Sequence, residues 1–509
     1  MAKDFVAVDR EQLLLMPPSL VEWLPEDHLV WTVLGTVERM NLDRFRVAYR
    51  LGAAGRAPYD PAMLVALLLY CYARGNRSSR GIERACWEDV GCKVIANQAT
   101  PDHSTIAEFR RRHETEIAQL FDDVLGLCAE AGLVSVGVIT IDGTKIKANA
   151  SMDQNRDYRQ VVTEILREAE EVDRREDEQF GDRRGDELPE QLRTPDGRRA
   201  ALDAARQRIA QRKDRAATEG EAVDRVVVDP QRSATGNGRR EWFRIARHQL
   251  EDHRCQQGRP IGRQREDRLV DAAERLEQNH AVELAANELY EDWRAAAVDR
   301  RGRRMHGNNA KPFVPSELPQ GPINISDPDS RVMRTQGTPP RQAYNAQAAV
   351  NDRQIILAAE VTVSAADFGH LEPMLNTTLR QLKRHAIKQR PDVVLADAGY
   401  WHTSQMRRIH EQGIEVLAPP DGNMRQGIRP GWEHGPYQEM RDKLATDRGR
   451  ELYKQRKITI EPVFGQIKHN RHIERFMRRG RAAAQSEWRL VTATHNLLKL
   501  HSHWTANTT

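Results

Sequence analysis

The sequence predicts a mixed α/β protein with an all-helical N-terminal region and a charged helical insertion. Three observations lead to this fold class. Apolar residues recur at helical spacing through residues 1–135, and five short apolar runs of strand character follow, the first at 136–142. A densely charged segment, 151–330, separates that first run from the other four. With 509 residues the chain is long enough for two to four domains.

The composition excludes several classes of protein. The longest strongly apolar run, 63–72, is too short to span a membrane, and the N-terminus lacks the apolar core of a signal peptide. The five cysteines are odd in number and irregularly spaced, which argues against a disulfide framework. We therefore expect a cytoplasmic protein. A net charge of +4 permits nucleic acid binding without demanding it.

Short helices and tight turns are expected in residues 1–135. Asp60 is a typical N-cap residue and Pro61 suits the first helical position, so a helix is expected from Pro61 to about Ala73. A later helix begins near Ile106 and ends in the basic run Arg110, Arg111 and Arg112. This pattern is typical of a helix-turn-helix DNA-binding domain, in which the three arginines would contact DNA. A helical bundle with a solvated arginine face fits the same spacing.

The segment 151–330 is predicted to form exposed helices. Residues 151–310 contain 32 Lys and Arg and 34 Asp and Glu, so their net charge is only −2. Helices are expected at about 200–211 and 268–298, where Ala, Glu and Arg are frequent. We expect this insertion to bury little apolar surface alone and to be least ordered at 168–185. It could clamp DNA or a partner subunit.

The remaining apolar runs define the order of the sheet. Strands are predicted at 342–350 and 354–363, joined by the turn signal Asn351-Asp352, then at 392–397 and 415–418. Helices are expected at 371–387, 403–412 and 447–500. Three antiparallel strands followed by crossovers into parallel partners make the RNase H-like arrangement. The catalytic domain would then comprise 136–150 and 331–509.

Two aspartates follow strands at the sheet edge where sites form. Asp142 and Asp397 each end an apolar run and precede small residues, so their carboxylates could hold Mg²⁺. Strand-end aspartates also commonly just cap a turn. A third carboxylate, Glu461, is expected on a helix, although Pro462 requires that a helix begins or kinks there. Lys468 lies two helical turns after Glu461 and opens a basic run that includes Arg471.

Other enzyme classes fit the sequence poorly. Haloacid-dehalogenase-like phosphatases also place Asp-Gly-Thr after a strand, but their nucleophilic aspartate would fall at Thr140. The cysteines show no paired spacing for zinc, and neither a His-Glu-x-x-His motif nor a phosphate-binding Gly-x-x-x-x-Gly-Lys loop occurs.

Three motifs in this order resemble the DDE transposases of bacterial insertion sequences. They are Ile141-Asp-Gly-Thr-Lys145, Leu395-Ala-Asp-Ala-Gly-Tyr400, and Tyr453-x-x-Arg456 with Glu461-Pro-Val-Phe-Gly-Gln-Ile-Lys468. The last is similar to the branch with a Tyr-Arg-Glu-Lys signature, which Tyr453, Arg456 and Lys468 match beside Glu461. Four residues separate Arg456 from Glu461, one more than in the family pattern, and the insertion lengthens the distance between the aspartates.

The resemblance implies both a reaction and a set of partners. Asp142, Asp397 and Glu461 would be the catalytic and metal-binding triad for two Mg²⁺ or Mn²⁺ ions. The protein would act as a homodimer on double-stranded DNA, binding terminal inverted repeats through 1–135 and cutting and joining strands at target DNA. Tyr453, Arg456, Lys468 and Arg471 would contact DNA. The alternative is a catalytically inactive or domesticated transposase that only binds DNA.

Overall fold

The computed structural model describes residues 19–47, 49, 58–180, 238–257, 261–262, 264–296, 314–334, 337–422, 427–428 and 431–508. The helix expected at 200–211 lies outside these ranges. None of the described helices combines the length and the apolar character needed to cross a bilayer.

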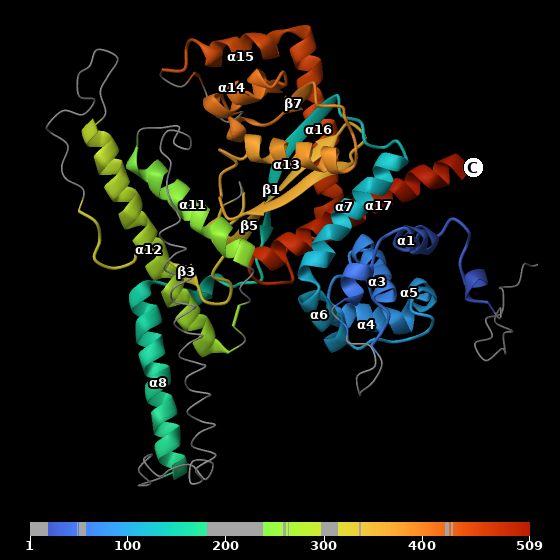
Figure 1. The fold of residues 1–509 in the computed structure, drawn as a ribbon, viewed down its shortest axis with the longest axis horizontal. Helices are drawn as coiled ribbons and strands as arrows, with labels where there is room; N and C mark the ends of the chain where they lie inside the picture. Colours follow the sequence, from blue (N-terminus) through green and yellow to red (C-terminus); the bar gives the residue numbers. More distant parts are fainter. Residues whose placement is uncertain are drawn as a thin grey trace, which may run out of the picture.

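A mixed sheet lies at the centre of the described residues (Figure 1). Its strands are ordered β4-β5-β1-β7-β8, and β6 pairs with the other part of β5. The strands are β1 (Val138–Lys147), β4 (Arg331–Met333), β5 (Arg341–Asn351), β6 (Ile356–Thr362), β7 (Val393–Leu395) and β8 (Glu415–Leu417). β5 runs antiparallel to β1 and β6, whereas β7 runs parallel to β1 and β8 parallel to β7. The predicted RNase H-like order is confirmed.

Strand β1 is longer than the sequence pattern suggested. It continues through Asp142 to Lys147 because β5 pairs with it antiparallel along Ile139–Lys147. The parallel partner β7 pairs only with Val138–Thr140. Asp142 therefore does not end its strand. It lies where β1 extends beyond its shorter neighbour, which still leaves its carboxylate at an open edge.

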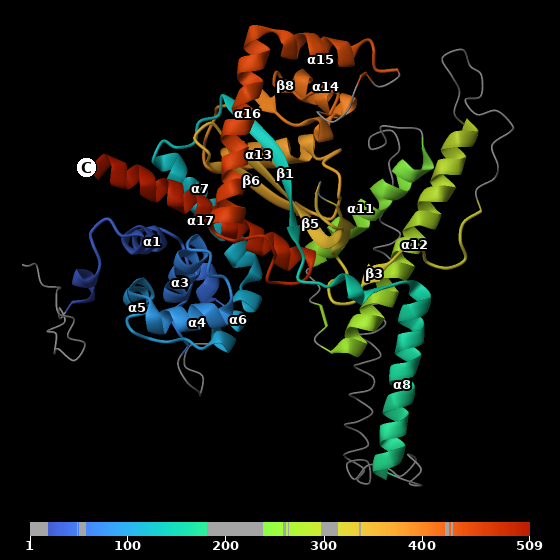
Figure 2. The same ribbon diagram turned by 180° about the vertical axis from the view of Figure 1, so that it is seen from behind.

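Helices follow the strands and pack on the sheet. They are α13 (Leu371–Arg384), the 3-10 turn η4 (Ala398–Tyr400), α14 (Thr403–Glu411), α15 (Pro436–Ala445), α16 (Asp447–Gly465), the π-helical turn η5 (Gln466–Asn470) and α17 (Arg481–Thr508). Figure 2 shows α16 running alongside β1, where the Thr459 and Thr140 hydroxyl oxygens are 2.9 Å apart.

The N-terminal region is helical, as predicted. Its helices are η1 (Leu20–Trp23), α1 (Leu29–Glu38), α2 (Asp43–Arg46), α3 (Pro61–Ala73), α4 (Ser79–Glu88), α5 (Val90–Ile95), α6 (His103–Arg112) and α7 (Glu114–Glu130). Asp60 accepts a hydrogen bond from the Ala62 N–H, so the predicted cap is present. α3 and α7 pack on α17, and one hydrophobic core extends from Val30 to Leu500.

The insertion contributes η2 (Met152–Gln154), β2 (Asn155–Arg156), α8 (Tyr158–Phe180), α11 (Arg239–Gln257), α12 (Arg265–Ala296) and β3 (Ile323–Asn324). One expectation about it was wrong. It has apolar clusters of its own, one around Trp242 between α11 and α12 and one around Leu269 between α12 and α8. Of the stretch expected to be least ordered, 168–180 belong to α8 and 181–185 lie outside the described residues, so this expectation stays a prediction.

Candidate active site

Asp142 and Asp397 occupy equivalent positions on neighbouring parallel strands. Thr140 of β1 pairs with Leu395 of β7. Asp142 lies two residues after Thr140, and Asp397 lies two residues after Leu395. Because parallel strands present their carboxyl ends at one edge, the two carboxylates lie on the same edge of the sheet. The sequence motifs are therefore brought together as expected, although 254 residues lie between them in the chain.

Backbone N–H groups hold both carboxylates in place. Asp142 Oδ1 accepts from the Gly143 N–H at 2.8 Å, and Asp397 Oδ1 accepts from the Gly399 N–H at 2.8 Å. Gly143 has no room for a side chain, since a Cβ there would lie 2.5 Å from Asp367 Oδ1. The glycine after Asp142 thus lets polar side chains of β5 and the loop after β6 approach the backbone of β1 closely.

The electrostatics of the pair favour binding of positive charge. Burial, and then the neighbouring Asp397 carboxylate, raise the pKa of Asp142 to about 7, while the Arg456 guanidinium opposes the rise. Burial, and then Asp367, raise the pKa of Asp397 above its ordinary value. Partly buried carboxylates that share a site repel one another, and a cation between them would relieve that repulsion.

Arg456 links two of the predicted site residues. It projects from α16, and its Nη1 donates to Asp142 Oδ2 at 2.9 Å. Its Nη2 lies 3.7 Å from Glu461 Oε1. The side chain of Arg456 is 13% exposed, against 55% for Glu461, so the arginine is part of the site while the glutamate reaches it from the rim.

Helix α16 is continuous through Pro462. Of the two predicted possibilities, no new helix begins at Glu461, which lies inside α16. Pro462 has no N–H to donate to the Ile458 carbonyl, and that carbonyl instead accepts from Gln354 Nε2 at 2.9 Å. A side chain from the turn after β5 thus replaces the missing helical hydrogen bond and anchors the helix one turn from Glu461.

The other two signature residues lie beside the same group. Lys468 Nζ donates to Thr144 Oγ1 at 2.6 Å, and Thr144 lies two residues after Asp142 on β1. Burial lowers the pKa of Lys468. The Tyr453 ring centre is 5.9 Å from the Arg456 guanidinium carbon. Both side chains therefore surround the carboxylate edge.

A fourth carboxylate, Asp367, was missed by the sequence analysis. Its Oδ1 accepts from Asn345 Nδ2 at 2.7 Å and from Gln347 Nε2 at 2.8 Å, and Lys145 Nζ lies 3.2 Å away. Asp367 lies in the loop after β6, and β6 runs in the same direction as β1 because both are antiparallel to β5. The predicted strand order already implied that this loop opens on the edge that carries Asp142.

Two residues expected to contact DNA are buried in the protein instead. Arg110 is 8% exposed, and its guanidinium donates to Tyr72 Oη at 3.1 Å and to the Arg77 carbonyl at 2.7 Å. Arg471 is 6% exposed and donates to Thr494 Oγ1 at 2.9 Å. The expected DNA contacts of Arg110 and Arg471 are therefore wrong, since helical spacing alone does not separate inward-facing from outward-facing arginines.

The neighbours of Arg110 remain available to a partner. Arg111 is exposed and pairs with Glu108, while Arg112 is exposed with its guanidinium carbon 5.3 Å from the centre of the Tyr49 ring. Exposed ion pairs of this kind are weak and can exchange for a phosphate contact.

The carboxylate edge partly fits a divalent metal. Within the described ranges, no three His, Cys, Asp or Glu side chains stand close enough together to hold a metal ion. Asp142 and Asp397 supply the hard oxygen donors that Mg²⁺ prefers, and burial, followed by the neighbouring Asp397 carboxylate, raises the pKa of Asp142. The two aspartates fit such an ion, and Glu461 would have to leave Arg456 to join them.

Comparison with family models gave two matches. The model described as "Transposase DDE domain" matches residues 320–497, which carry Asp397 and Glu461. The model described as "Transposase domain (DUF772)" matches residues 18–112. Comparison with curated proteins and with solved structures gave no match.

Proposed function

The chain belongs to the DDE transposases of insertion sequences, and we propose that it cleaves and joins DNA strands at the ends of such an element. The observation that supports this most is the equivalent placement of Asp142 and Asp397 on parallel strands, with Arg456 and Glu461 beside them. The Tyr-Arg-Glu-Lys branch is part of the proposal.

We assign the catalytic roles to three carboxylates. Asp142, Asp397 and Glu461 would hold two divalent ions, Mg²⁺ or Mn²⁺, which lower the pKa of an attacking water or 3′-hydroxyl and stabilise the leaving oxygen. Arg456 would keep Asp142 ionised and oriented before the ions bind. Asp367 would position Lys145, whose ammonium lies beside the edge where a scissile phosphate would approach.

The proposed DNA contacts come from several elements. Lys468, Tyr453 and Arg456 lie at the carboxylate edge, and the exposed Arg111 and Arg112 lie on α6. We propose that α6 and its neighbours help to recognise terminal inverted repeats. A homodimer that holds both ends, and a cytoplasmic location at the bacterial nucleoid, complete the proposal.

A cleavage assay with matched variants tests this function. Duplex DNA carrying the flanking inverted repeat is incubated with Mg²⁺ and either wild type, Asp397→Asn or Asp392→Asn. Asp392 is exposed at the opposite end of β7, so its variant makes the same chemical change away from the site. We expect Asp397→Asn alone to lose cleavage while it keeps DNA binding.

Two results would count against the proposal. Cleavage by Asp397→Asn at the wild-type rate would reject the assigned site. Specific binding without cleavage by the wild type, across Mg²⁺ and Mn²⁺ concentrations, would favour the DNA-binding alternative.

A further inference from the structure

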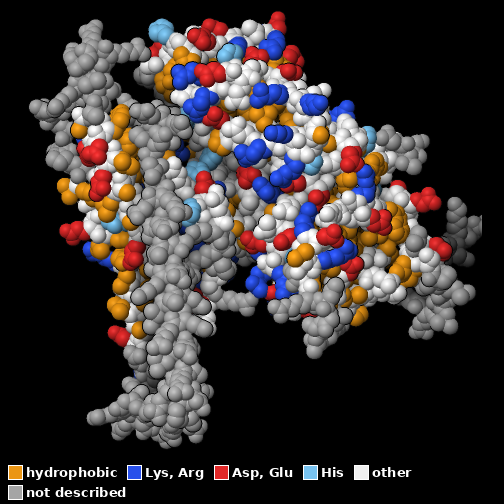
Figure 3. All heavy atoms as spheres, viewed as in Figure 1, with side chains coloured by type: hydrophobic (Ala, Val, Ile, Leu, Met, Phe, Trp, Pro, Cys, Tyr) orange, Lys and Arg blue, Asp and Glu red, His pale blue; other side chains and the backbone are white. Residues whose placement is uncertain are grey.

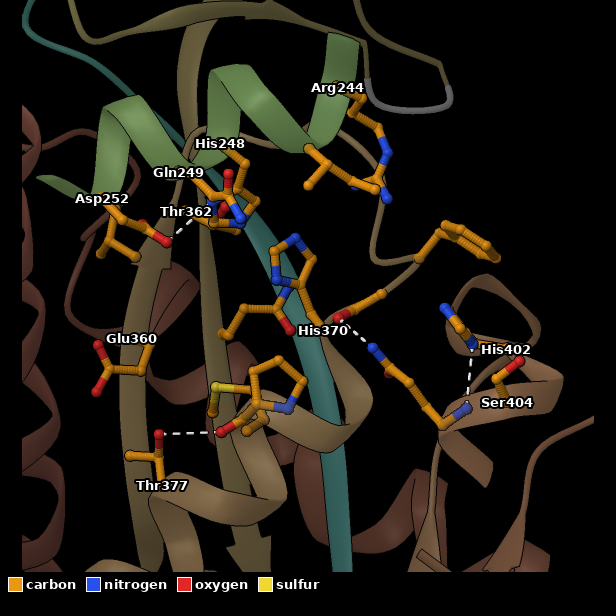
Figure 4. Close-up of a pocket in the computed structure, with 18 of the residues that line it drawn as sticks. Arg244, His248, Gln249, Asp252, Glu360, Thr362, His370, Thr377, His402 and Ser404 are labelled. Atoms are coloured by element: carbon orange, nitrogen blue, oxygen red, sulfur yellow. Dashed lines mark hydrogen bonds and ion pairs between the residues drawn. The ribbon is translucent and has the colours of Figure 1, made fainter. Parts of the chain in front are cut away.

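A cavity of about 650 Å³ lies between the insertion and the catalytic sheet (Figure 4). Its walls come from α11, Gln347 of β5, β6, the residues just before α13, α13 itself, α14 and the first residue of α17. Asp142, Asp397 and Glu461 do not line it. The cavity is therefore separate from the carboxylate edge, and it exists because the insertion helix α11 covers this side of the sheet.

The lining carries an excess of positive charge. Five arginines and two carboxylates line the cavity, both carboxylates already have partners, and two of the arginines, Arg244 and Arg408, pair with Glu241 and Glu372. Asp252 accepts from Arg481 Nη1 at 2.5 Å, and Glu360 accepts from Arg489 at 2.7 Å. The arginines of the lining are Arg244, Arg380, Arg407, Arg408 and Arg481. Figure 3 shows Lys and Arg side chains gathered over the α13 region of this face.

Two of these arginines have guanidinium groups available for a ligand. Arg407 is 73% exposed on its side chain, and the Glu411 carboxylate is 3.9 Å away. Arg380 is exposed and donates to Thr377 Oγ1 at 2.8 Å, and no described carboxylate forms an ion pair with it. Both residues lie on the wall opposite α11.

A buried imidazole in the cavity has an unused ring nitrogen. His370 is 8% exposed, and its Nε2 has no hydrogen-bond partner among the described residues. Figure 4 shows its ring between α11 and the start of α13. An unpaired buried polar atom costs free energy that a ligand oxygen in the cavity would recover.

Two helices begin at the cavity. α13 has 14 residues and α14 has 9, and their N-cap residues, His370 and His402, both line it. The N-terminus of a helix carries partial positive charge and attracts anions, phosphate groups above all. Helix dipoles, arginines and an unused imidazole nitrogen thus converge on one space.

A second cavity adjoins the first on the side of the catalytic edge. It has a volume of about 780 Å³, shares Phe368, His402 and Ser404 with the first and is lined by Ala398 and Gly399, directly after Asp397. The Phe368 and His402 rings stack with their centres 4.9 Å apart. A DNA strand that leaves Asp397 along these two cavities would bring its backbone to the arginines.

We propose that the first cavity binds a backbone phosphate of the DNA strand that runs from the catalytic edge toward the insertion. The inference rests on the proposed function and deepens it, because it adds a phosphate contact beside the catalytic edge and gives the insertion helix α11 the role of closing the space in which that phosphate is held. A free phosphate or a mononucleotide shares this chemistry, and the experiment separates these sources.

The first test compares two double variants of equal charge change. Arg380→Ala/Arg407→Ala removes the two available guanidinium groups, and Lys388→Ala/Arg390→Ala removes exposed charges just before β7, at the opposite end of the sheet. Affinity for inverted-repeat DNA is measured without divalent metal over a range of salt concentrations, after thermal unfolding has shown that each variant is folded. The cavity variant should bind DNA about tenfold more weakly than the control. The slope of its log affinity against log salt concentration should be smaller than that of the control by roughly 1–2.

The second test locates the phosphate. Single neutral methylphosphonates are placed along each strand near the cleavage position. The wild type should bind DNA with a methylphosphonate at one or two of these positions more weakly than unmodified DNA. The cavity variant should bind that modified DNA and unmodified DNA equally well. Equal salt slopes for the two double variants would overturn the proposal. It would also be overturned if every methylphosphonate weakened binding by the cavity variant as much as it weakens binding by the wild type.

The source of the phosphate is tested with small anions. If inorganic phosphate or a mononucleotide raises the melting temperature of the wild type but not of the cavity variant, while DNA affinity is the same in both, the cavity is a small-anion site and the DNA assignment is wrong. All binding is measured without metal, so a wild type that does not cleave would reject the proposed function and leave this test valid.

Discussion

The Arg456 guanidinium lies between Asp142 and Glu461, 2.9 Å from an oxygen of the first and 3.7 Å from an oxygen of the second. It provides positive charge where burial and Asp397 raise the pKa of Asp142. An arginine in this position stabilises the ionised aspartate in the absence of metal, and it also holds Glu461 at the rim. The extra residue between Arg456 and Glu461 does not prevent the contact, because α16 is a continuous helix here.

Replacing Arg456 with Gln should slow strand cleavage at least tenfold, because Asp142 would then lose the charge that keeps it ionised and oriented. Binding of inverted-repeat DNA should change less than threefold. Arg450→Gln, on an exposed part of the same helix, is the matched control. A cleavage rate for Arg456→Gln equal to that of the control would show that the arginine is not needed.

Asp367→Asn should raise the Mg²⁺ concentration needed for half-maximal cleavage. Asparagine can still accept from Asn345 and Gln347, but it removes a negative charge from the site and the partner of Lys145. Metal binding measured by calorimetry should weaken in parallel, while DNA affinity stays the same. If Lys145→Met raises the required Mg²⁺ concentration equally, and the Asp367→Asn/Lys145→Met double variant raises it no further, the two residues act as one pair. An unchanged metal affinity would remove Asp367 from the site.

Gln354→Asn should destabilise the protein by about 1 kcal/mol, because the shorter amide cannot reach the Ile458 carbonyl. Asparagine suits this position since Gln354 has a φ of 62°, which asparagine tolerates well. Pro462→Ala restores a helical donor to the same carbonyl, so in that background Gln354→Asn should cost less. Chemical denaturation of the four proteins of this cycle measures the coupling, and simple additivity would contradict the explanation.

Acid should destabilise the fold through His495. Burial, and then Arg471, lower the pKa of His495 to about 3. The unfolded histidine binds a proton below about pH 6.5 while the folded one does not, so stability is retained above pH 6.5 and lost as the pH falls toward 3. Between pH 7 and pH 5 this loss is about 1–2 kcal/mol. His495→Gln should remove that part of the pH dependence, and His469→Gln, at an exposed position, should leave it unchanged.

The order of the sheet could be predicted from the sequence because strand runs, turn signals and helical spacing are local. Asp142 and Asp397 followed from the same patterns, since each closes an apolar run. The length of β1 did not, because its continuation depends on pairing with β5, 200 residues further along the chain. Long-range pairing decides where a strand ends, and a short apolar run contains no information about its partner.

Side-chain partners were the least predictable feature. Asp367 follows a strand as Asp397 does, but several residues intervene, and the sequence does not show that Asn345 and Gln347 lie beside it. The helical pattern of residues 1–135 also does not show how closely this region packs on the rest of the chain. α7 and α3 pack on α17, and Arg77 forms a buried ion pair with Glu487 at 2.8 Å, so removing this region would expose the core of the catalytic unit.

Substitution on α6 is therefore a better test of DNA recognition than truncation. Arg110→Ala should lower the free energy of unfolding by roughly 2–4 kcal/mol, because it leaves Tyr72 and the Arg77 carbonyl unpaired in the core. Arg111→Ala/Arg112→Ala should leave stability within about 0.5 kcal/mol, since both side chains are exposed, but it should weaken binding to inverted-repeat DNA and reduce its salt dependence. Thermal unfolding and binding measured on the same preparations separate the two effects. DNA affinity that is unchanged in the double variant would assign α6 to the scaffold or to a dimer contact, and the recognition surface would then have to lie on other helices of this region.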